Sequence, residues 1–237
     1  MKIIVLGEST VQGGGWLDRI EQRYPDILAN LIQSCLDQKI EYYNAGLGAS
    51  VIAPSSPGYK ASQKPSAAER LDSEVIAKHP DILVIAYGLN DMRAGMDPQS
   101  FGVELRSLID RVRRKCEPLT VLVNVYHMTA WKSYQPFDRG SREATIHYNS
   151  VIRDSADENG CLYADVWGAE GERDWMIHQD GVHANVLGNI VIANEIFKLI
   201  AQNLPGLAED ITRRHGETEW TRRTAAWRPS RVEESWK

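Results

Sequence analysis

A serine, an aspartate and a histidine have the types and neighbours that a hydrolytic catalytic triad requires. Asp180 and His183 are three residues apart, just before a stretch with helical periodicity. At this spacing in a turn, the Asp180 carboxylate can accept from the imidazole Nδ1–H of His183 and leave Nε2 free as a base. A serine hydroxyl becomes a good nucleophile when such a base takes its proton, and Ser9 follows the first apolar run of the chain.

Each of these residues also has a plainer interpretation. Ser9 and Asp180 are common helix-capping types, and His183 could be an ordinary surface histidine. His178 adds a metal site as another alternative, because His178, Asp180 and His183 offer nitrogen and oxygen ligands. That site has no apparent fourth ligand and would leave Ser9 without a role, so we predict no metal and no organic cofactor.

Glycines after Ser9 raise the question of a phosphate-binding loop. Gly13, Gly14 and Gly15 are consecutive, but no Gly-Lys-Ser/Thr follows and the spacing is not Gly-x-Gly-x-x-Gly. Glu8 would also repel an anion. We therefore rank phosphate binding below a turn with a capping serine.

Two further segments could supply hydrogen-bond donors to a developing oxyanion. Asn90, in the run Gly-Leu-Asn-Asp, has a side-chain N–H that can donate without a proton changing hands. Glycines at 46 and 48 would let the backbone approach a ligand closely, so a backbone N–H there is a second candidate. Taken alone, both segments are typical of plain turns.

Short apolar runs alternate with longer segments of helical period, which predicts an α/β fold. We expect a flavodoxin-like three-layer sandwich with a five-stranded, mostly parallel sheet, whose ligands bind beyond the carboxyl ends of the strands. The predicted strands are 3–6, 41–44, 82–86, 120–125 and 161–166. The predicted helices are 16–36, interrupted at Pro25, then 67–78, 100–116, 142–158 and 185–203. All the candidate residues fall at strand ends or just before a helix, and this shared placement favours one site.

The same four segments resemble, in order and kind, the conserved blocks of the SGNH (GDSL-type) hydrolase family. They are Gly7-Glu8-Ser9, Gly46 to Ala49, Gly88 to Asp91 and Asp180 to His183. The resemblance implies that Ser9 is the nucleophile, His183 the general base and acid, and Asp180 the group that orients His183. It also implies an oxyanion hole made by Ser9, Gly48 and Asn90. Glu8 replaces the usual aspartate, and another register of the second block would use Ala49 instead of Gly48.

The resemblance implies ester cleavage through an acyl-serine intermediate. We predict a serine esterase for short-chain acyl esters, with acetyl groups on carbohydrate as the favoured substrate. Two loops, 50–65 and 126–141, are long enough to border a substrate, and the second carries four aromatic residues that could stack on a sugar: Tyr126, Trp131, Tyr134 and Phe137. The alternatives are a lipase or thioesterase acting on longer chains, and a non-enzymatic binding module on the same fold.

Composition limits the remaining possibilities. The 237 residues are 43% hydrophobic and 25% charged, which is typical of a globular protein. A net charge of −5 argues against nucleic-acid binding, and no apolar run approaches the length of a membrane span. Three widely spaced cysteines and no visible signal peptide favour a cytoplasmic location. We expect a catalytic domain over 1–206 and a charged, tryptophan-containing extension over 207–237 that could form a homo-oligomer.

Overall fold

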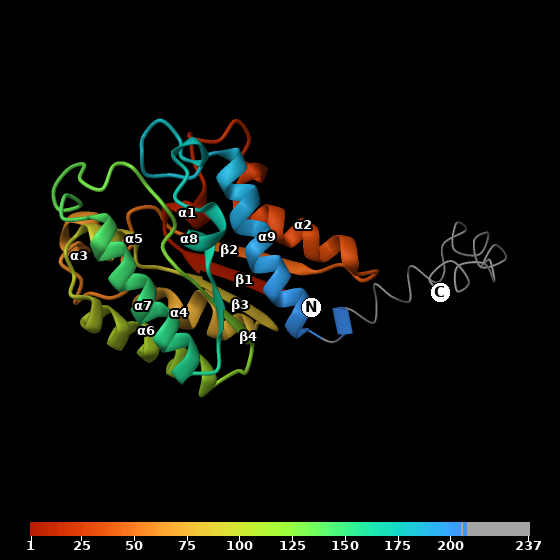
Figure 1. Cartoon of the computed structure of the whole chain (residues 1–237). Coiled ribbons are helices and arrows are strands. Elements are labelled where there is room, and N and C mark those ends of the chain that lie inside the picture. Colours follow the sequence, from red (N-terminus) through yellow and green to blue (C-terminus); the bar gives the residue numbers. More distant parts are fainter. Residues whose placement is uncertain (205, 208–237) are drawn as a thin grey trace, which may run out of the picture.

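A five-stranded, all-parallel sheet forms the centre of the protein, with helices on both sides (Figure 1). The computed structural model describes residues 1–204 and 206–207. The strand order β2-β1-β3-β4-β5 is that of the flavodoxin-like fold, so the predicted α/β three-layer sandwich is confirmed. The strands are β1 (Lys2–Gly7), β2 (Glu41–Gly46), β3 (Ile82–Ala86), β4 (Leu119–Val123) and β5 (Leu162–Ala164).

The long helices form two layers. α2 (Tyr24–Cys35) and α9 (Val186–Asn203) pack together on one face of the sheet, and α4 (Ala67–Glu74), α6 (Pro98–Arg113) and α7 (Arg142–Glu158) cover the other (Figure 1). The shorter elements are α1 (Ser9–Gln12), η1 (Ile20–Gln22), α3 (Tyr59–Ser62), η2 (Ile76–Lys78), α5 (Leu89–Arg93), α8 (Val166–Glu170) and η3 (Asp174–Met176).

The core lies between the sheet and its two helical layers. All four residues of Ile3–Leu6 are fully buried, because helices cover both faces of β1. A strand buried on both faces has a continuous apolar sequence instead of an alternating one, which is the pattern that predicted it.

The strand register brings distant segments of the chain together. Gly7 pairs with Gly46 on one side and with Ala86 on the other, so β1, β2 and β3 end at the same level. The chain leaves β1 toward β2 and then returns to pair β3 on the opposite side, which makes this edge a topological switch point. The segments that follow these three strands therefore meet at one place.

The predicted helix over 16–36 is wrong in its first half. Helix α2 begins only at Tyr24, and Pro25 lies in its first turn, where the fixed φ of proline fits a helix start. The preceding segment is an irregular turn that begins at Gly13, with φ +77°, followed by the short η1. A helix that ran back through Pro25 to Trp16 would lose a backbone hydrogen bond at the proline, so α2 begins at Tyr24.

Smaller boundary errors have local causes. The fifth strand ends at Ala164, because the Asp165 side chain accepts the N–H of Gly168 and starts α8. The fourth ends at Val123 rather than 125, and the second predicted helix divides into α4 and η2. The remaining predicted helices correspond to α6, α7 and α9. Almost all of the predicted extension, 208–237, lies outside the described residues.

Candidate active site

Ser9 stands at the carboxyl end of β1, an interior strand of the sheet. β1 ends at Gly7, Glu8 caps the next helix, and Ser9 is the first residue of α1. The turn is tight: a Cβ on Gly7 would lie 2.3 Å from Val11 Cγ2 and 2.7 Å from the carbonyl oxygen of Ala86. Only glycine permits this close approach, which places the Ser9 hydroxyl above the sheet edge.

His183 and Asp180 meet Ser9 from the loop that precedes α9. His183 Nε2 lies 2.9 Å from Ser9 Oγ, and His183 Nδ1 lies 2.7 Å from Asp180 Oδ2. The other oxygen of Asp180 accepts the backbone N–H groups of Val182 and His183, at 2.8 and 2.9 Å. With Nδ1–H donating to the carboxylate, Nε2 is the acceptor that faces the serine hydroxyl.

The pKa values of this pair suit a carboxylate beside a neutral imidazole. Burial alone would raise the pKa of Asp180, but the hydrogen bonds from His183 and Val182 outweigh it and lower this pKa to about 2. Burial lowers the pKa of His183 below its usual value, although the nearby Asp180 carboxylate acts in the opposite direction. His183 is therefore neutral at pH 7, as a general base must be.

Asn90 reaches the same edge from the end of β3. Gly88, at φ +126°, turns the chain into α5, and the Asn90 side chain, 4% exposed, donates from Nδ2 to the Ser50 carbonyl at 3.0 Å. Both carboxyl oxygens of Glu8 accept backbone N–H groups of this turn, from Gly88 at 2.8 Å and Asn90 at 3.0 Å. Glu8 thus holds the turn that carries Asn90.

The segment after β2 completes the edge. A Cβ on Gly48 would lie 3.9 Å from Ser9 Cβ, so this residue borders the serine directly. Its N–H donates to Gln12 Oε1 at 2.5 Å, and the Gln12 side chain is exposed. Ala49 has φ 61°, a left-handed conformation that glycine adopts more easily. Of the two donors considered for the second block, Gly48 is the residue with a close approach to Ser9.

His178 lies near the pair but does not form a metal cluster with it. His178 Nδ1 and His183 Nδ1 both face Asp180 Oδ2, at 3.2 and 2.7 Å, while His183 Nε2 faces Ser9. Within residues 1–204 and 206–207, no three His, Cys, Asp or Glu side chains are arranged to hold a metal ion.

Comparison with known proteins agrees with this geometry. A family model described as the GDSL-like Lipase/Acylhydrolase family matches residues 5–189, which is most of the chain. This chain belongs to the GDSL-like lipase/acylhydrolase family. It is a serine hydrolase, as the four motifs predicted. A search of curated proteins found no match.

Solved structures share the fold of this GDSL hydrolase. A lipase/acylhydrolase from Enterococcus faecalis has TM-score 0.67 and 18% identity, with 85% of this chain and 96% of that chain covered. Axe2, an acetylxylan esterase from Geobacillus stearothermophilus, has TM-score 0.63 and 21% identity, with 84% and 93% covered. TesA has TM-score 0.67 and 16% identity, with 86% and 100% covered.

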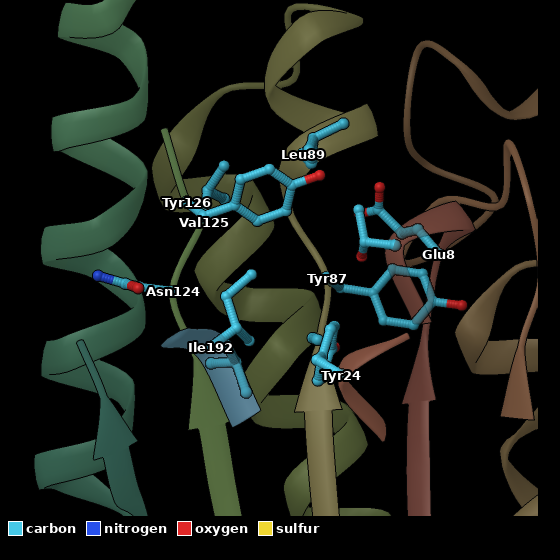
Figure 2. A pocket seen from close by; sticks show the side chains of 11 residues that line it. Glu8, Tyr24, Tyr87, Leu89, Asn124, Val125, Tyr126 and Ile192 are labelled. Carbon is cyan, nitrogen blue, oxygen red and sulfur yellow. The ribbon is translucent and has the colours of Figure 1, made fainter. Parts of the chain in front are cut away.

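Glu8 departs from the Asp of the GDSL name and lies in a buried environment. It is 1% exposed, and burial, assisted by the charge of Asp91, raises its pKa well above the usual range. Burial also raises the pKa of Asp91 to about 7. Figure 2 shows Glu8 beside Tyr87 at a cavity of about 20 Å³, which has room for roughly one water molecule.

Two residues that the sequence patterns did not single out lie beside His183 in this GDSL hydrolase. The Trp16 indole stacks on His183, with ring centroids 3.6 Å apart and planes 8° from parallel. Arg93, one turn after Asn90 on α5, is 4% exposed, and its positive charge helps to lower the pKa of His183. The position of Trp16 directly after three glycines was a sequence signal that could have identified it. For Arg93, the sequence offered only its position three residues after Asn90.

The two long loops differ in what they offer to a substrate. Val51, Ile52 and Ala53 of the first loop are buried, and Asp91 accepts the N–H of Ile52. In the second loop, Tyr126 and Phe137 are buried and unable to stack on a ligand, while Tyr134 is 65% exposed. None of the helices in the described part of the chain has the length and apolar character to cross a membrane.

Proposed function

We propose that this GDSL hydrolase cleaves short-chain acyl esters, with acetyl groups on carbohydrate as the favoured substrate, through an acyl enzyme on Ser9. The observation that carries the proposal is the continuous hydrogen-bond chain from Asp180 Oδ2 through the imidazole of His183 to Ser9 Oγ. A carboxylate, an imidazole and a hydroxyl in this order can generate a serine nucleophile at neutral pH.

In the first half-reaction, Ser9 Oγ attacks the ester carbonyl while His183 Nε2 takes the hydroxyl proton. The tetrahedral intermediate collapses, the C–O bond to the alcohol breaks, and the proton on Nε2 passes to the leaving alcohol oxygen. In the second half-reaction, His183 takes a proton from water, which attacks the acyl-serine and releases the acid. Asp180 accepts from Nδ1–H throughout and stabilises the imidazolium that forms transiently.

Three N–H groups are proposed to stabilise the oxyanion: the backbone N–H groups of Ser9 and Gly48 and the side-chain Nδ2–H of Asn90. Gly48 N–H is bonded to Gln12 Oε1, so the Gln12 side chain must move aside before Gly48 can donate to the substrate. Gln12 is exposed, and rotation of an exposed side chain is rapid. Asn90 has a second amide hydrogen besides the one donated to Ser50.

One structural observation favours a substrate that carries a sugar. Tyr134, in the loop after β4, exposes an aromatic ring on which a sugar could stack. The acetylxylan esterase with the same fold adds support to this choice at the level of fold.

The test is a panel of p-nitrophenyl esters from acetate to palmitate, together with acetylated xylo-oligosaccharides, with Ser9→Ala as control. We expect kcat/KM to be highest for acetate and to fall steadily with chain length. A preference for the longest chains would support the lipase or thioesterase alternative. No hydrolysis of any ester, with no labelling of Ser9 by a fluorophosphonate, would support the binding-module alternative.

Three further predictions concern the whole chain. We propose the division into a catalytic domain over 1–206 and an extension over 207–237 that supports self-association. Deleting 208–237 and measuring the mass in solution tests this, because the mass gives the number of subunits per particle. A number of subunits that is the same with and without 208–237 rejects self-association through the extension. The cytoplasmic location is also a prediction, which fractionation of the source cells would test.

A further inference from the structure

A parallel stack joins Trp16 to the proposed general base. The ring centroids of Trp16 and His183 are 3.6 Å apart and the two planes differ by 8°, so the indole covers one face of the imidazole. The two residues belong to segments at opposite ends of the chain, the turn after α1 and the loop before α9, which lie together at the top of Figure 1.

The glycine-rich turn is shaped to hold the indole there. Gly13 donates its N–H to the Ser9 carbonyl at 2.9 Å and has φ +77°, which reverses the chain directly after α1. A Cβ on Gly14 would lie 2.3 Å from Trp16 Cζ3, so Gly14 packs beneath the ring. The turn that resembled a phosphate loop in sequence therefore supports an aromatic ring.

We propose that Trp16 is a positioning residue, whose indole holds the His183 imidazole in the plane that faces Ser9 and keeps water from one of its faces. The proposal rests on the proposed function, in which His183 Nε2 takes the Ser9 proton. If the imidazole rotates out of line with the Ser9 hydroxyl, the rate of proton transfer falls, because the transfer needs a short, aligned hydrogen bond.

Four groups face His183 and set its charge state together with the indole. They are the Ser9 hydroxyl and the Asp180 carboxylate, both hydrogen-bonded to it, and Arg93 and His178, whose charges disfavour the imidazolium. Burial is the largest influence and lowers the pKa of His183. An indole also attracts a cation, but loss of the ring lets water reach the imidazole, so we expect the pKa of His183 to rise when Trp16 is removed.

The experiment follows the rate of Ser9 labelling by a fluorophosphonate as a function of pH. The probe loses fluoride as its phosphorus bonds to Ser9 Oγ, and His183 takes the proton. For Trp16→Ala we expect labelling at pH 7 to slow by about 10- to 100-fold and the acid limb to move to higher pH. Trp16→Phe, which keeps a ring over the imidazole, should recover most of the rate and return the limb toward its original position.

Two neighbouring glycines give a matched pair that leaves Trp16 in place. Gly14→Ala should push the indole from His183 and reproduce the slower labelling and the shifted limb. Gly15→Ala makes the same chemical change where a Cβ meets nothing within 4 Å, so it should behave as wild type. Circular dichroism identifies any variant that fails to fold. If either Trp16→Ala or Gly14→Ala is unfolded, the labelling profile of the other variant tests the proposal.

The outcomes separate this proposal from the proposed function. Wild-type protein whose Ser9 does not react removes the nucleophile assignment itself. A wild type that is labelled, with folded Trp16→Ala and Gly14→Ala labelled at the same rate and with the same pH profile, overturns the positioning role. An unchanged labelling profile with only a higher KM for esters also overturns it, because Trp16 would then contact substrate instead of the base.

Discussion

Ser9 Oγ and His183 Nε2 lie 2.9 Å apart, although 174 positions of sequence separate the two residues. Ser9 follows the end of the interior strand β1, and His183 lies in the loop that precedes α9. Between them, the chain builds the rest of the sheet and the long helices α2, α4, α6 and α7. The short distance between the two side chains therefore depends on the complete fold. Substitutions along the hydrogen-bond chain test the role proposed for each residue.

Asp180→Asn should lower kcat by about 10⁴-fold, because an amide favours the wrong tautomer of the histidine. The measurement is steady-state hydrolysis of p-nitrophenyl acetate. His178→Gln is the matched control, since His178 Nδ1 accepts the backbone N–H of Asp180 and lies 3.2 Å from the same carboxylate oxygen, while His183 is the histidine that faces Ser9. We expect less than about a tenfold change for His178→Gln; a loss as large as that of Asp180→Asn would contradict the assignment of roles.

The rate of hydrolysis should fall on acidification as His183 becomes protonated. Because burial lowers the pKa of His183, the midpoint of the acid limb of kcat/KM should lie below the ordinary value of 6.5. Activity is expected at full strength above that midpoint and is lost as pH falls through it. A pH profile from 4 to 8 checks this, and a flat profile would remove His183 as the base.

Asn90→Ala should lower kcat by roughly 10²- to 10³-fold with little change in KM, because the amide would donate to the transition state more strongly than to the substrate. Asn149→Ala is a matched control: Asn149 is also a buried amide, and its side chain bonds to the backbone N–H and carbonyl of Val125. The control should lose stability without this loss of kcat. Equal kcat values for the two variants would argue against the oxyanion role.

Gln12→Ala tests whether the N–H of Gly48 takes part. Gln12 Oε1 accepts this N–H at 2.5 Å, so removal of the side chain frees the donor for substrate. A neutral hydrogen bond contributes a net of about 0.5–1.5 kcal/mol, so kcat/KM should increase by roughly 2- to 10-fold. A large decrease would instead mean that Gln12 supports the site, and would favour Ala49 as the donor.

The buried carboxyl group of Glu170 should make the free energy of unfolding depend on pH, independently of catalysis. It is 1% exposed, and burial raises its pKa from 4.5 to about 8. The folded state therefore binds its proton more tightly than the unfolded state, and this contribution is full below about pH 4.5 and is lost as pH rises through about 8.

Glu170→Gln is neutral at every pH and should gain stability relative to wild type between pH 5 and pH 8. The gain is limited to about 1.4 kcal/mol for each pKa unit of the shift. Urea unfolding at the two pH values measures it. Glu172→Gln is the control, because Arg142 lowers the pKa of Glu172 and no such gain is expected there. Equal pH slopes for wild type and Glu170→Gln would contradict the prediction.

Local patterns were sufficient for much of the architecture. The apolar run Ile3–Leu6 predicted a strand, and the periodicity of 142–158 predicted α7 at the observed bounds. The error over residues 16–23 arose because helical spacing of apolar residues there competed with the glycine turn. Periodicity alone contains no information on which of the two wins.

The sequence by itself determined the chemical groups at the site, their placement after strands, and the family to which they belong. Only the tertiary structure decided that Glu8 supports the turn of Asn90, that Gln12 occupies the N–H of Gly48, and that Trp16 covers His183. These contacts join segments from different strands and loops. Their geometry depends on strand register and side-chain packing across the whole domain, which no local spacing of residues specifies.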